Sequence, residues 1–196
     1  MQVSSMVDNV LGELKDAIAK PETAEFVVPE SELLRHAKWM TEHRGYIHTK
    51  ETLNALLDYK KGYGLFIRGP FGSGKSSFFT ALGIEGLKRF SLLDETKDQI
   101  DKVWEKIRSY DNYELVIDDL GREQKMNNYH GFEEIVPWIV EHRMYCKKRT
   151  HFTTNMNSED FLAKYDDAFA TTDRIRELCK IHVFSGPTHR KPRVYG

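Results

Sequence analysis

Residues 69–76 read Gly69-Pro70-Phe71-Gly72-Ser73-Gly74-Lys75-Ser76, the spacing G-x-x-x-x-G-K-[ST] of a phosphate-binding loop. An apolar run of strand type at residues 63–68 precedes the loop, and helical spacing follows it at residues 77–87. In that setting the glycines allow backbone N–H groups to turn inward around a triphosphate, beside the positive end of the helix dipole. Lys75 can reach the β- and γ-phosphates, and the Ser76 hydroxyl can ligate Mg²⁺. The stretch from Gly69 to Ser77 therefore predicts a site for ATP or GTP, in preference to a flexible glycine-serine turn.

A second apolar strand, at residues 114–118, ends in the carboxylates Asp118 and Asp119. The carboxyl ends of parallel strands collect ligands at one edge of an α/β sheet. We expect Asp118 to hold, mostly through water, the Mg²⁺ that Ser76 also contacts. We expect Asp119 to orient or deprotonate the attacking water. The alternative is a solvated turn at a strand end, but the position downstream of a phosphate loop favours the catalytic role.

Two later segments carry further polar candidates. The strand at residues 150–154 ends in Asn155, whose amide could hydrogen-bond both the γ-phosphate and the attacking water. Asparagine is also a common strand terminator, so Asn155 has a structural alternative. On the helical stretch 172–178, Arg174 and Arg176 are two residues apart and cannot share one helix face. At most one of the two arginines should therefore point at a given phosphate. The alternative is that both belong to a solvated, charged helix face and contact no phosphate.

The chain resembles the AAA+ ATPases of the DnaC/IstB type in four segments. These are GPFGSGKSS, LVIDDLG, FTTN and DRIREL, and a short strand follows the last of them. This type comprises the replicative helicase loaders and the transposition helper ATPases, and the resemblance covers about residues 50–190. The resemblance implies that Gly69 to Ser76 form the Walker A motif and that Asp118 and Asp119 form the Walker B motif. It implies that Asn155 is the sensor 1 residue. It also implies that Arg174, rather than Arg176, is an arginine finger donated to a neighbouring subunit's nucleotide.

Three features depart from the family pattern. Asp119 stands where Glu is commoner in AAA+ proteins, and its shorter side chain leads us to expect slow hydrolysis. Only a dozen residues follow the predicted strand 180–184, so the lid domain is expected to be absent or vestigial. Arg190 is then the candidate for a lid-type sensor 2 arginine, or part of a basic tail near DNA. Pro137 falls inside the helical pattern 132–147 and predicts a kink or restart there.

Strands alternate with helices between residues 63 and 184, which predicts an α/β fold with a parallel sheet between helical layers. The resemblance makes this a P-loop NTPase fold of the AAA+ type, with five strands in the order 5-1-4-3-2. The predicted strands are residues 63–68, 90–93, 114–118, 150–154 and 180–184, and the predicted helices are residues 75–89, 95–109, 132–147, 158–165 and 167–179.

Residues 1–45 are predicted to be a helical N-terminal extension, ahead of an ATPase core at residues 46–196. An apolar stripe indicates an amphipathic helix at residues 3–20, followed by helices at 31–44 and 49–60. The first helix could dock on a helicase or another client, pack on its own core or mediate self-association. Just before the first strand, where AAA+ proteins usually hold adenine, Tyr46 or Ile47 could cover the base.

Composition narrows the function classes. The chain of 196 residues is 40% hydrophobic and 30% charged with a net charge of -1, which excludes a globally polycationic nucleic-acid binder. Any contact with DNA must come from a local basic patch, either at residues 147–149 or at residues 189–193. The alternative is that these charges are solvated and bind nothing. Cys146 and Cys179 lack metal-ligand spacing and are expected to be reduced packing residues. No apolar run is long enough to span a membrane, so we expect no membrane contact and a cytoplasmic location.

The leading hypothesis is a DNA-replication helper ATPase that binds ATP and Mg²⁺ and self-associates in an ATP-dependent way. It would couple ATP hydrolysis to the loading of a replicative helicase on single-stranded DNA, to which its own affinity should be weak. An IstB-like transposition helper ATPase shares the same core and is the first alternative. A P-loop small-molecule kinase is an alternative of another class, and a non-hydrolysing ATP switch is a third.

Overall fold

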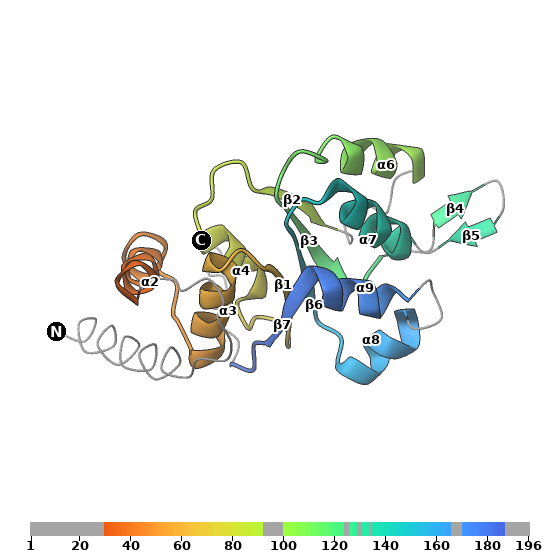
Figure 1. Ribbon diagram of the computed structural model, residues 1–196. Coiled ribbons are helices and arrows are strands. Elements are labelled where there is room, and N and C mark those ends of the chain that lie inside the picture. The colour runs from red at the N-terminus through yellow and green to blue at the C-terminus, as the bar shows by residue number, and fades with distance from the viewer. Residues whose placement is uncertain are drawn as a thin grey trace, which may run out of the picture.

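A five-stranded, all-parallel sheet runs through the centre of the protein (Figure 1). The computed structural model describes residues 30–91, 100–123, 126–128, 131–133, 135–165 and 170–186. The strands are β1 (Gly64–Arg68), β2 (Lys88–Ser91), β3 (Leu115–Leu120), β6 (Thr150–Thr154) and β7 (Cys179–Val183), in the order β2-β3-β6-β1-β7. Numbered along the chain, these five strands follow the order 5-1-4-3-2, so the expected topology is confirmed. The helix predicted at residues 3–20 and the tail with Arg190 lie outside the described residues.

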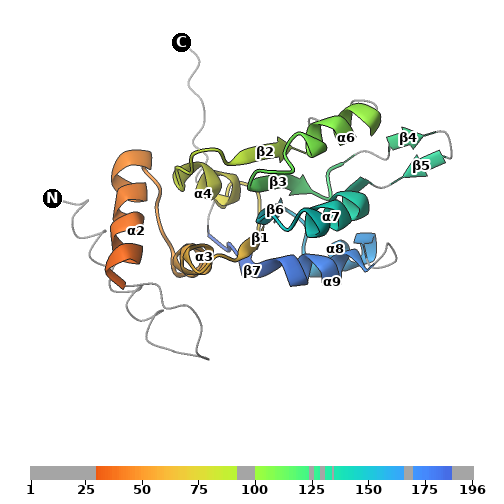
Figure 2. The same cartoon turned by 45° about the horizontal axis from the view of Figure 1, so that its top comes forward.

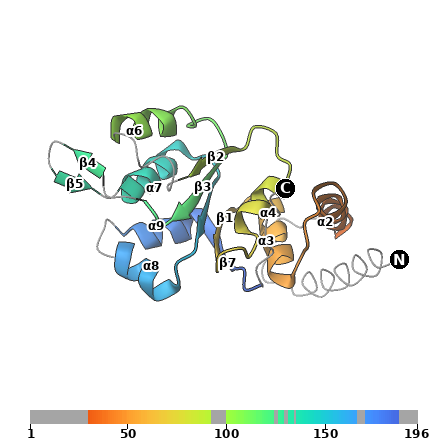
Figure 3. The ribbon, with the colours of Figure 1, turned by 180° about the vertical axis from the view of Figure 1, so that it is seen from behind.

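Helices cover both faces of the sheet (Figure 2; Figure 3). β1 shows how its residues divide between the layers, because Leu65 and Ile67 join one buried apolar cluster and Phe66 joins the other. A strand buried on both faces reads as a continuous apolar run, which is how β1 and β3 could be recognised in the sequence, whereas the buried β6 is mostly threonine. One layer contains α2 (Glu30–Arg44), α3 (Lys50–Lys60) and α4 (Lys75–Ala81), and the other contains α6 (Ile100–Arg108), α7 (Ile135–Cys146), α8 (Ser158–Tyr165) and α9 (Thr171–Leu178).

Helix α2 shares its core with the helices that follow it. Leu33, Ala37 and Met40 are fully buried in the cluster that also contains residues of α3, α4 and β1. The i, i+4 and i+7 spacing of these three residues gives α2 one apolar stripe. Residues 30–44 are thus packed on the nucleotide-binding part of the chain, and the proposed division at residue 45 stays a prediction. Within the described residues, no helix is both long and apolar enough to cross a membrane.

The helix predicted at residues 75–89 was wrong in its length, because α4 ends at Ala81. Gly83 adopts a left-handed conformation with φ of 64°, which ends helices readily when the residue is glycine. A Cβ at this position would lie 2.4 Å from the Trp39 indole of α2, so the turn also needs a glycine for space. The chain then enters β2 at Lys88, two residues before the predicted strand start.

The helix predicted at residues 132–147 was also too long at its start. Residues 131–133 form β5 (Gly131–Glu133), which pairs antiparallel with β4 (Met126–Asn128) in a hairpin that the sequence analysis missed. Figure 1 shows this hairpin extending away from the sheet beyond α7. Helix α7 begins at Ile135 and continues through Pro137. Of the kink or restart expected at Pro137, the structure shows a helix that starts two residues before it, and a proline in the first helical turn removes no intrahelical hydrogen bond.

Candidate nucleotide-binding site

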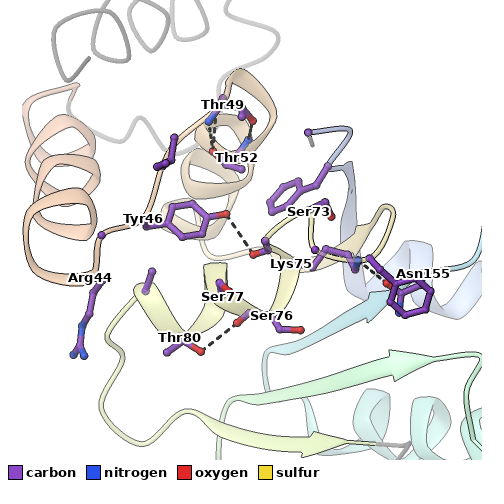
Figure 4. Close-up of a pocket in the computed structure, with 18 of the residues that line it drawn as sticks. Arg44, Tyr46, Thr49, Thr52, Ser73, Lys75, Ser76, Ser77, Thr80 and Asn155 are labelled. Atoms are coloured by element: carbon purple, nitrogen blue, oxygen red, sulfur yellow. Dashed lines mark hydrogen bonds between the residues drawn. The ribbon is translucent and has the colours of Figure 1, made fainter. Parts of the chain in front are cut away.

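A cleft of about 1280 Å³ opens at the carboxyl ends of the central strands (Figure 4). The phosphate-loop segment from Phe71 to Ser77 forms one side, and residues 43–47 with Thr49 and Thr52 form the other. Asp119 and Asn155, from the ends of β3 and β6, also line it. Ligands of open α/β sheets bind at this edge, and the volume is ample for a nucleoside triphosphate.

The phosphate loop holds Lys75 in a buried position. Gly74, which precedes α4, has φ of 89°, a left-handed conformation that glycine adopts without steric cost. The Lys75 Nζ donates to the carbonyls of Gly69 and Pro70 at 2.8 and 2.9 Å, and to Asn155 Oδ1 at 2.7 Å. Only 6% of Lys75 is exposed. The loop therefore positions this cation at the cleft floor beside the predicted sensor residue.

Asn155 links Lys75 to the second Walker B acid. Its Nδ2 donates to Asp119 Oδ1 at 3.0 Å while its Oδ1 accepts from Lys75. Figure 4 shows the bond between Lys75 and Asn155 at the cleft wall. Three side chains that are 36 or more residues apart in sequence thus form one hydrogen-bonded chain, as the sequence analysis expected them to converge. The chain thus joins a cation, an amide and a carboxylate, the groups predicted to bind phosphate and to activate water.

Asp118 lies beneath the cleft lining and is 5% exposed. The Ser76 Oγ lies 3.0 Å from both of its carboxylate oxygens, and the Thr153 hydroxyl donates to Oδ1. The two residues predicted to hold Mg²⁺ are therefore in contact. Their hydroxyl and carboxylate oxygens are the ligand type that Mg²⁺ prefers, so this pair fits that cation.

Arg89 is a member of the site that the sequence analysis missed. It lies on the edge strand β2, and its guanidinium forms an ion pair with Asp118, with Nε 3.1 Å from Oδ2. Its Nη1 donates to Thr80 Oγ1 at 3.3 Å, and the residue lines the cleft. In sequence Arg89 reads as an ordinary surface charge, because its partner is 29 residues away. Asp118 is therefore neutralised by an arginine at the position where a cation would bind.

A bulge in β3 makes the side chains of Asp118 and Asp119 point in different directions. The register between β3 and β6 shifts between Ile117 and Leu120, and Asp119 has φ of 63°. A positive φ is uncommon for a residue other than glycine, and such strain is often found at functional sites. The Asp119 amide donates to Thr153 Oγ1 at 3.0 Å, which fixes this conformation. As a result Asp118 points toward Ser76 while Asp119 faces the cleft.

The loop after β3 is anchored to α8 through Glu123. Its Oε2 accepts from the Gly121 amide at 2.8 Å, and its Oε1 accepts from the Tyr165 hydroxyl at 2.6 Å. The Lys164 ammonium lies 2.7 Å from the same oxygen. Because Glu123 is 9% exposed, these partners compensate for its burial. The network stabilises the chain immediately beyond the two acids.

At the opposite end of the cleft, Tyr46 and Ile47 line the wall as the sequence analysis suggested. Tyr46 is buried, and its hydroxyl donates to the Gly74 carbonyl at 3.5 Å (Figure 4). Burial raises the pKa of its phenol well above the usual value. Ile47 is 47% exposed. Tyr46 thus contacts the phosphate loop, and of these two residues Ile47 is the one whose side chain is available to a base.

At the cleft rim, the contact of Arg122 with the predicted loop residue Phe71 also escaped the sequence analysis. Phe71, at the tip of the phosphate loop, is 55% exposed, and the Arg122 guanidinium lies 5.4 Å from the centre of its ring. Both residues line the cleft. Arg122 follows the Walker B acids by three residues and carries a positive charge at the cleft mouth.

The two candidate arginine fingers lie outside the cleft lining. Arg174, on α9, has its Nη1 3.5 Å from Glu141 Oε1 of α7, and Arg176 has its Nη1 3.1 Å from Asp173 Oδ1. Neither guanidinium lines the cleft in its own chain.

In the basic segment 147–149, Arg149 forms an ion pair with Glu114, with its Nη2 3.2 Å from Oε2. The Arg149 guanidinium also lies 4.4 Å from the centre of the Tyr59 ring.

Comparison with known proteins establishes the fold. No protein-family model and no curated protein matches the sequence. A solved structure described as a candidate primosome component from Streptococcus pyogenes serotype M3 aligns with a TM-score of 0.50, covering 91% of this chain and 98% of that chain at 20% identity. The chain shares the fold of this structure, and its strand order 5-1-4-3-2 is the one expected of a P-loop NTPase fold of the AAA+ type. A further solved structure, described as DnaI, has a TM-score of 0.48 and 19% identity, covering 87% of this chain and 94% of that chain.

Proposed function

We propose that the protein is a helper ATPase of DNA replication, which couples ATP binding and hydrolysis to the loading of a helicase on single-stranded DNA. The ATPase assignment depends on one observation: Lys75, Asn155 and Asp119 form a hydrogen-bonded chain along the cleft that the phosphate loop lines. A phosphate-binding cation and a carboxylate joined through an amide are the groups that nucleotide hydrolysis uses.

Each side chain has a distinct role in this proposal. Lys75 exchanges the loop carbonyls for the β- and γ-phosphate oxygens. Asn155 positions the γ-phosphate and the attacking water, and Asp119 orients that water or accepts its proton. Ser76 and Asp118 would hold Mg²⁺, which when bound neutralises charge on the phosphate oxygens. The shorter reach of Asp119 relative to glutamate is the reason to expect slow turnover.

The proposed client is a replicative helicase. The motif resemblance to helicase loaders motivates this choice, and the structural neighbour with the same fold is described as a primosome component. Such a role implies action in the cytoplasm. An IstB-like helper that delivers a transposase has the same ATPase core, so the two differ in the partner. Deleting residues 1–29 and testing pull-down of a helicase or a transposase distinguishes them.

A small-molecule kinase would use the same phosphate loop with an acceptor hydroxyl in place of water. The pairing of Asp119 with Asn155 suits water activation. Release of inorganic phosphate from ATP with no added acceptor is the expected result, and a strict requirement for an acceptor would point to the kinase. ATP binding with no phosphate release would point to the non-hydrolysing switch.

The central experiment measures the ATPase rate with and without single-stranded DNA, and the solution mass with and without ATP. We expect a slow basal rate, stimulation by DNA and a larger mass with ATP. A monomer that hydrolyses ATP at a rate independent of DNA would retain the ATPase assignment and overturn the loader role.

A further inference from the structure

Three side chains with metal-binding chemistry gather at the edge of the sheet opposite the nucleotide cleft. Asp111 lies in the turn between α6 and β3, four residues before β3 begins. His142 and Cys146 lie in the last part of α7, and Cys146 comes four residues before β6 begins. Both β3 and β6 start at this edge, whereas the phosphate site lies where they end. The cluster is therefore separate from the proposed ATPase site.

We propose that Asp111, His142 and Cys146 form a binding site for a divalent cation of the zinc class. One ligand atom from each residue lies within 4.8 Å of the other two. His142 Nε2 is 2.7 Å from Asp111 Oδ1 and 3.5 Å from Cys146 Sγ. The carboxylate oxygen and the sulfur thus both lie next to the same imidazole nitrogen and within 4.8 Å of each other.

These distances are close to those of a tetrahedral site. Zinc bonds of about 2.0–2.3 Å place neighbouring ligand atoms roughly 3.3–3.6 Å apart. The separation between His142 and Cys146 already lies in this range. The separation between His142 and Asp111 must open by roughly half an ångström, because coordination would replace their hydrogen bond. Binding releases the Cys146 thiol proton to solvent, and the proton that His142 Nε2 shares with Asp111 moves to Nδ1 or, from a doubly protonated ring, to solvent.

Arg143 preorganises the cluster. This side chain is fully buried next to His142, and it donates to the carbonyls of Tyr110 and Tyr113 at 3.0 and 2.8 Å. Those two carbonyls bracket Asp111, so Arg143 fixes the turn against α7. The spacing of His142 and Cys146 by four residues places both on the same helix face. The ligands are thereby held in place by the fold rather than by chance contact of mobile surface groups.

The ligand set selects the cation. One imidazole, one thiol and one carboxylate suit Zn²⁺ or Co²⁺, whereas Mg²⁺ and Ca²⁺ prefer oxygen ligands alone. His142 is 23% exposed and Asp111 is 37% exposed, so a cation can enter from solvent and a water can complete the coordination. The Trp104 ring meets His142 edge-on at 5.8 Å and covers one side of it. When occupied, the site would link the α6–β3 turn to α7.

Cobalt titration of the full chain tests the proposal, because thiolate coordination to Co²⁺ gives a charge-transfer absorption band. We expect the band to saturate at one Co²⁺ per chain and to disappear when Zn²⁺ is added. Cys146→Ser should abolish it, and His142→Gln and Asp111→Asn should weaken binding by at least about tenfold. Cys179→Ser, at the other thiol, should retain it. Asp118→Asn should also retain it, because that variant removes the expected Mg²⁺ ligand.

A second measurement detects the cross-link itself. Saturating Zn²⁺ should raise the thermal midpoint of the full chain by about 5–10 °C and leave that of Cys146→Ser unchanged. Absence of the cobalt band, or a band that survives Cys146→Ser, would overturn the proposal. The contact between His142 and Asp111 would then be only a hydrogen bond that secures the turn.

Discussion

Asp118 shares its carboxylate among Ser76, Thr153 and Arg89, and this sharing has consequences for cation binding. The Arg89 guanidinium is a competitor for Mg²⁺ at Oδ2, because both seek the same negative charge. Arg89→Gln should therefore raise the apparent affinity of the nucleotide complex for Mg²⁺, by up to about tenfold for a charge-assisted pair with one partly exposed member. Magnesium titration of ATP binding measures it. Arg35→Gln, an exposed arginine on α2, is the control, and reduced Mg²⁺ affinity in Arg89→Gln would mean that Arg89 supports the site.

Lys75 and Asp119 should separate binding from turnover. Lys75→Ala removes the cation at the end of the hydrogen-bonded chain, so ATP binding should be lost. Asp119→Asn keeps the side-chain shape and removes the basic carboxylate, so ATP should still bind while turnover falls by at least about a hundredfold. Equilibrium ATP binding and phosphate release, measured on the same samples, distinguish the two effects. Unchanged ATP affinity in Lys75→Ala would be incompatible with the phosphate-loop assignment.

At the scale of elements, the strands and the phosphate loop could be predicted because their signals are local. β1 differs from its prediction by one residue because it is a continuous apolar run, and β6 matches at both ends because β-branched threonines favour a strand. The end of α4 was missed because apolar spacing continues past Gly83, and the steric need for glycine there comes from Trp39 on another helix. The pairing of Arg89 with Asp118 was missed because it depends on the neighbouring positions of β2 and β3. Local patterns contain no information about such contacts.

The segment between α2 and α3 should respond to acid through His48. Burial lowers the pKa of His48 to about 4 from its ordinary value of 6.5. Between pH 4 and pH 6.5 the unfolded chain therefore binds a proton at His48 more readily than the folded chain does. The contribution of His48 to the free energy of unfolding is full above pH 6.5 and is lost as the pH drops toward 4. The loss from this group is at most about 3 kcal/mol. Burial also lowers the pKa of His151, which acts in the same direction.

Urea unfolding of the protein between pH 7.5 and 4.5 measures this dependence. His48→Gln should flatten the part of the curve below pH 6.5, whereas His43→Gln, an exposed histidine of α2, should leave its shape unchanged. If the slope in His48→Gln equals that of the parent chain, other groups account for the acid sensitivity.

At the scale of the whole molecule, the proposed DNA contact must come from a local basic surface. Lys147 and Lys148 are exposed, whereas Arg149 is committed to Glu114 and Tyr59. Replacing both lysines with Gln should lower the salt dependence of single-stranded DNA affinity by about 1.4 in the slope of log K against log salt, at about 0.7 per phosphate contact. Arg35→Gln with Lys38→Gln, on α2, is a charge-matched control. An unaltered slope in the Lys147 and Lys148 variant would place the DNA surface elsewhere.

Assembly into an oligomer would give Arg174 a target that its own chain does not provide. Arg174 lies outside the cleft lining of its own chain, with its Nη1 3.5 Å from Glu141 Oε1, so as an arginine finger it must reach a neighbour's nucleotide. Such an arginine is worth about 10³ to 10⁵ in rate. ATP hydrolysis per subunit should then rise with protein concentration as subunits meet. Arg174→Ala should keep ATP binding and lose that rise, whereas Arg176→Ala should retain it.

Mixing two inactive variants distinguishes action between subunits from action within one. Lys75→Ala has the arginine without a working phosphate loop, and Arg174→Ala has the loop without the arginine. In mixed assemblies an Arg174→Ala subunit can receive the arginine of a Lys75→Ala neighbour, so partial activity should reappear although each variant alone is inactive. Glu141→Gln removes the carboxylate next to Arg174 in its own chain and should leave the rescue intact. Failure of both the concentration dependence and the rescue would mean that Arg174 does not act between subunits, because a trans-acting arginine must produce both.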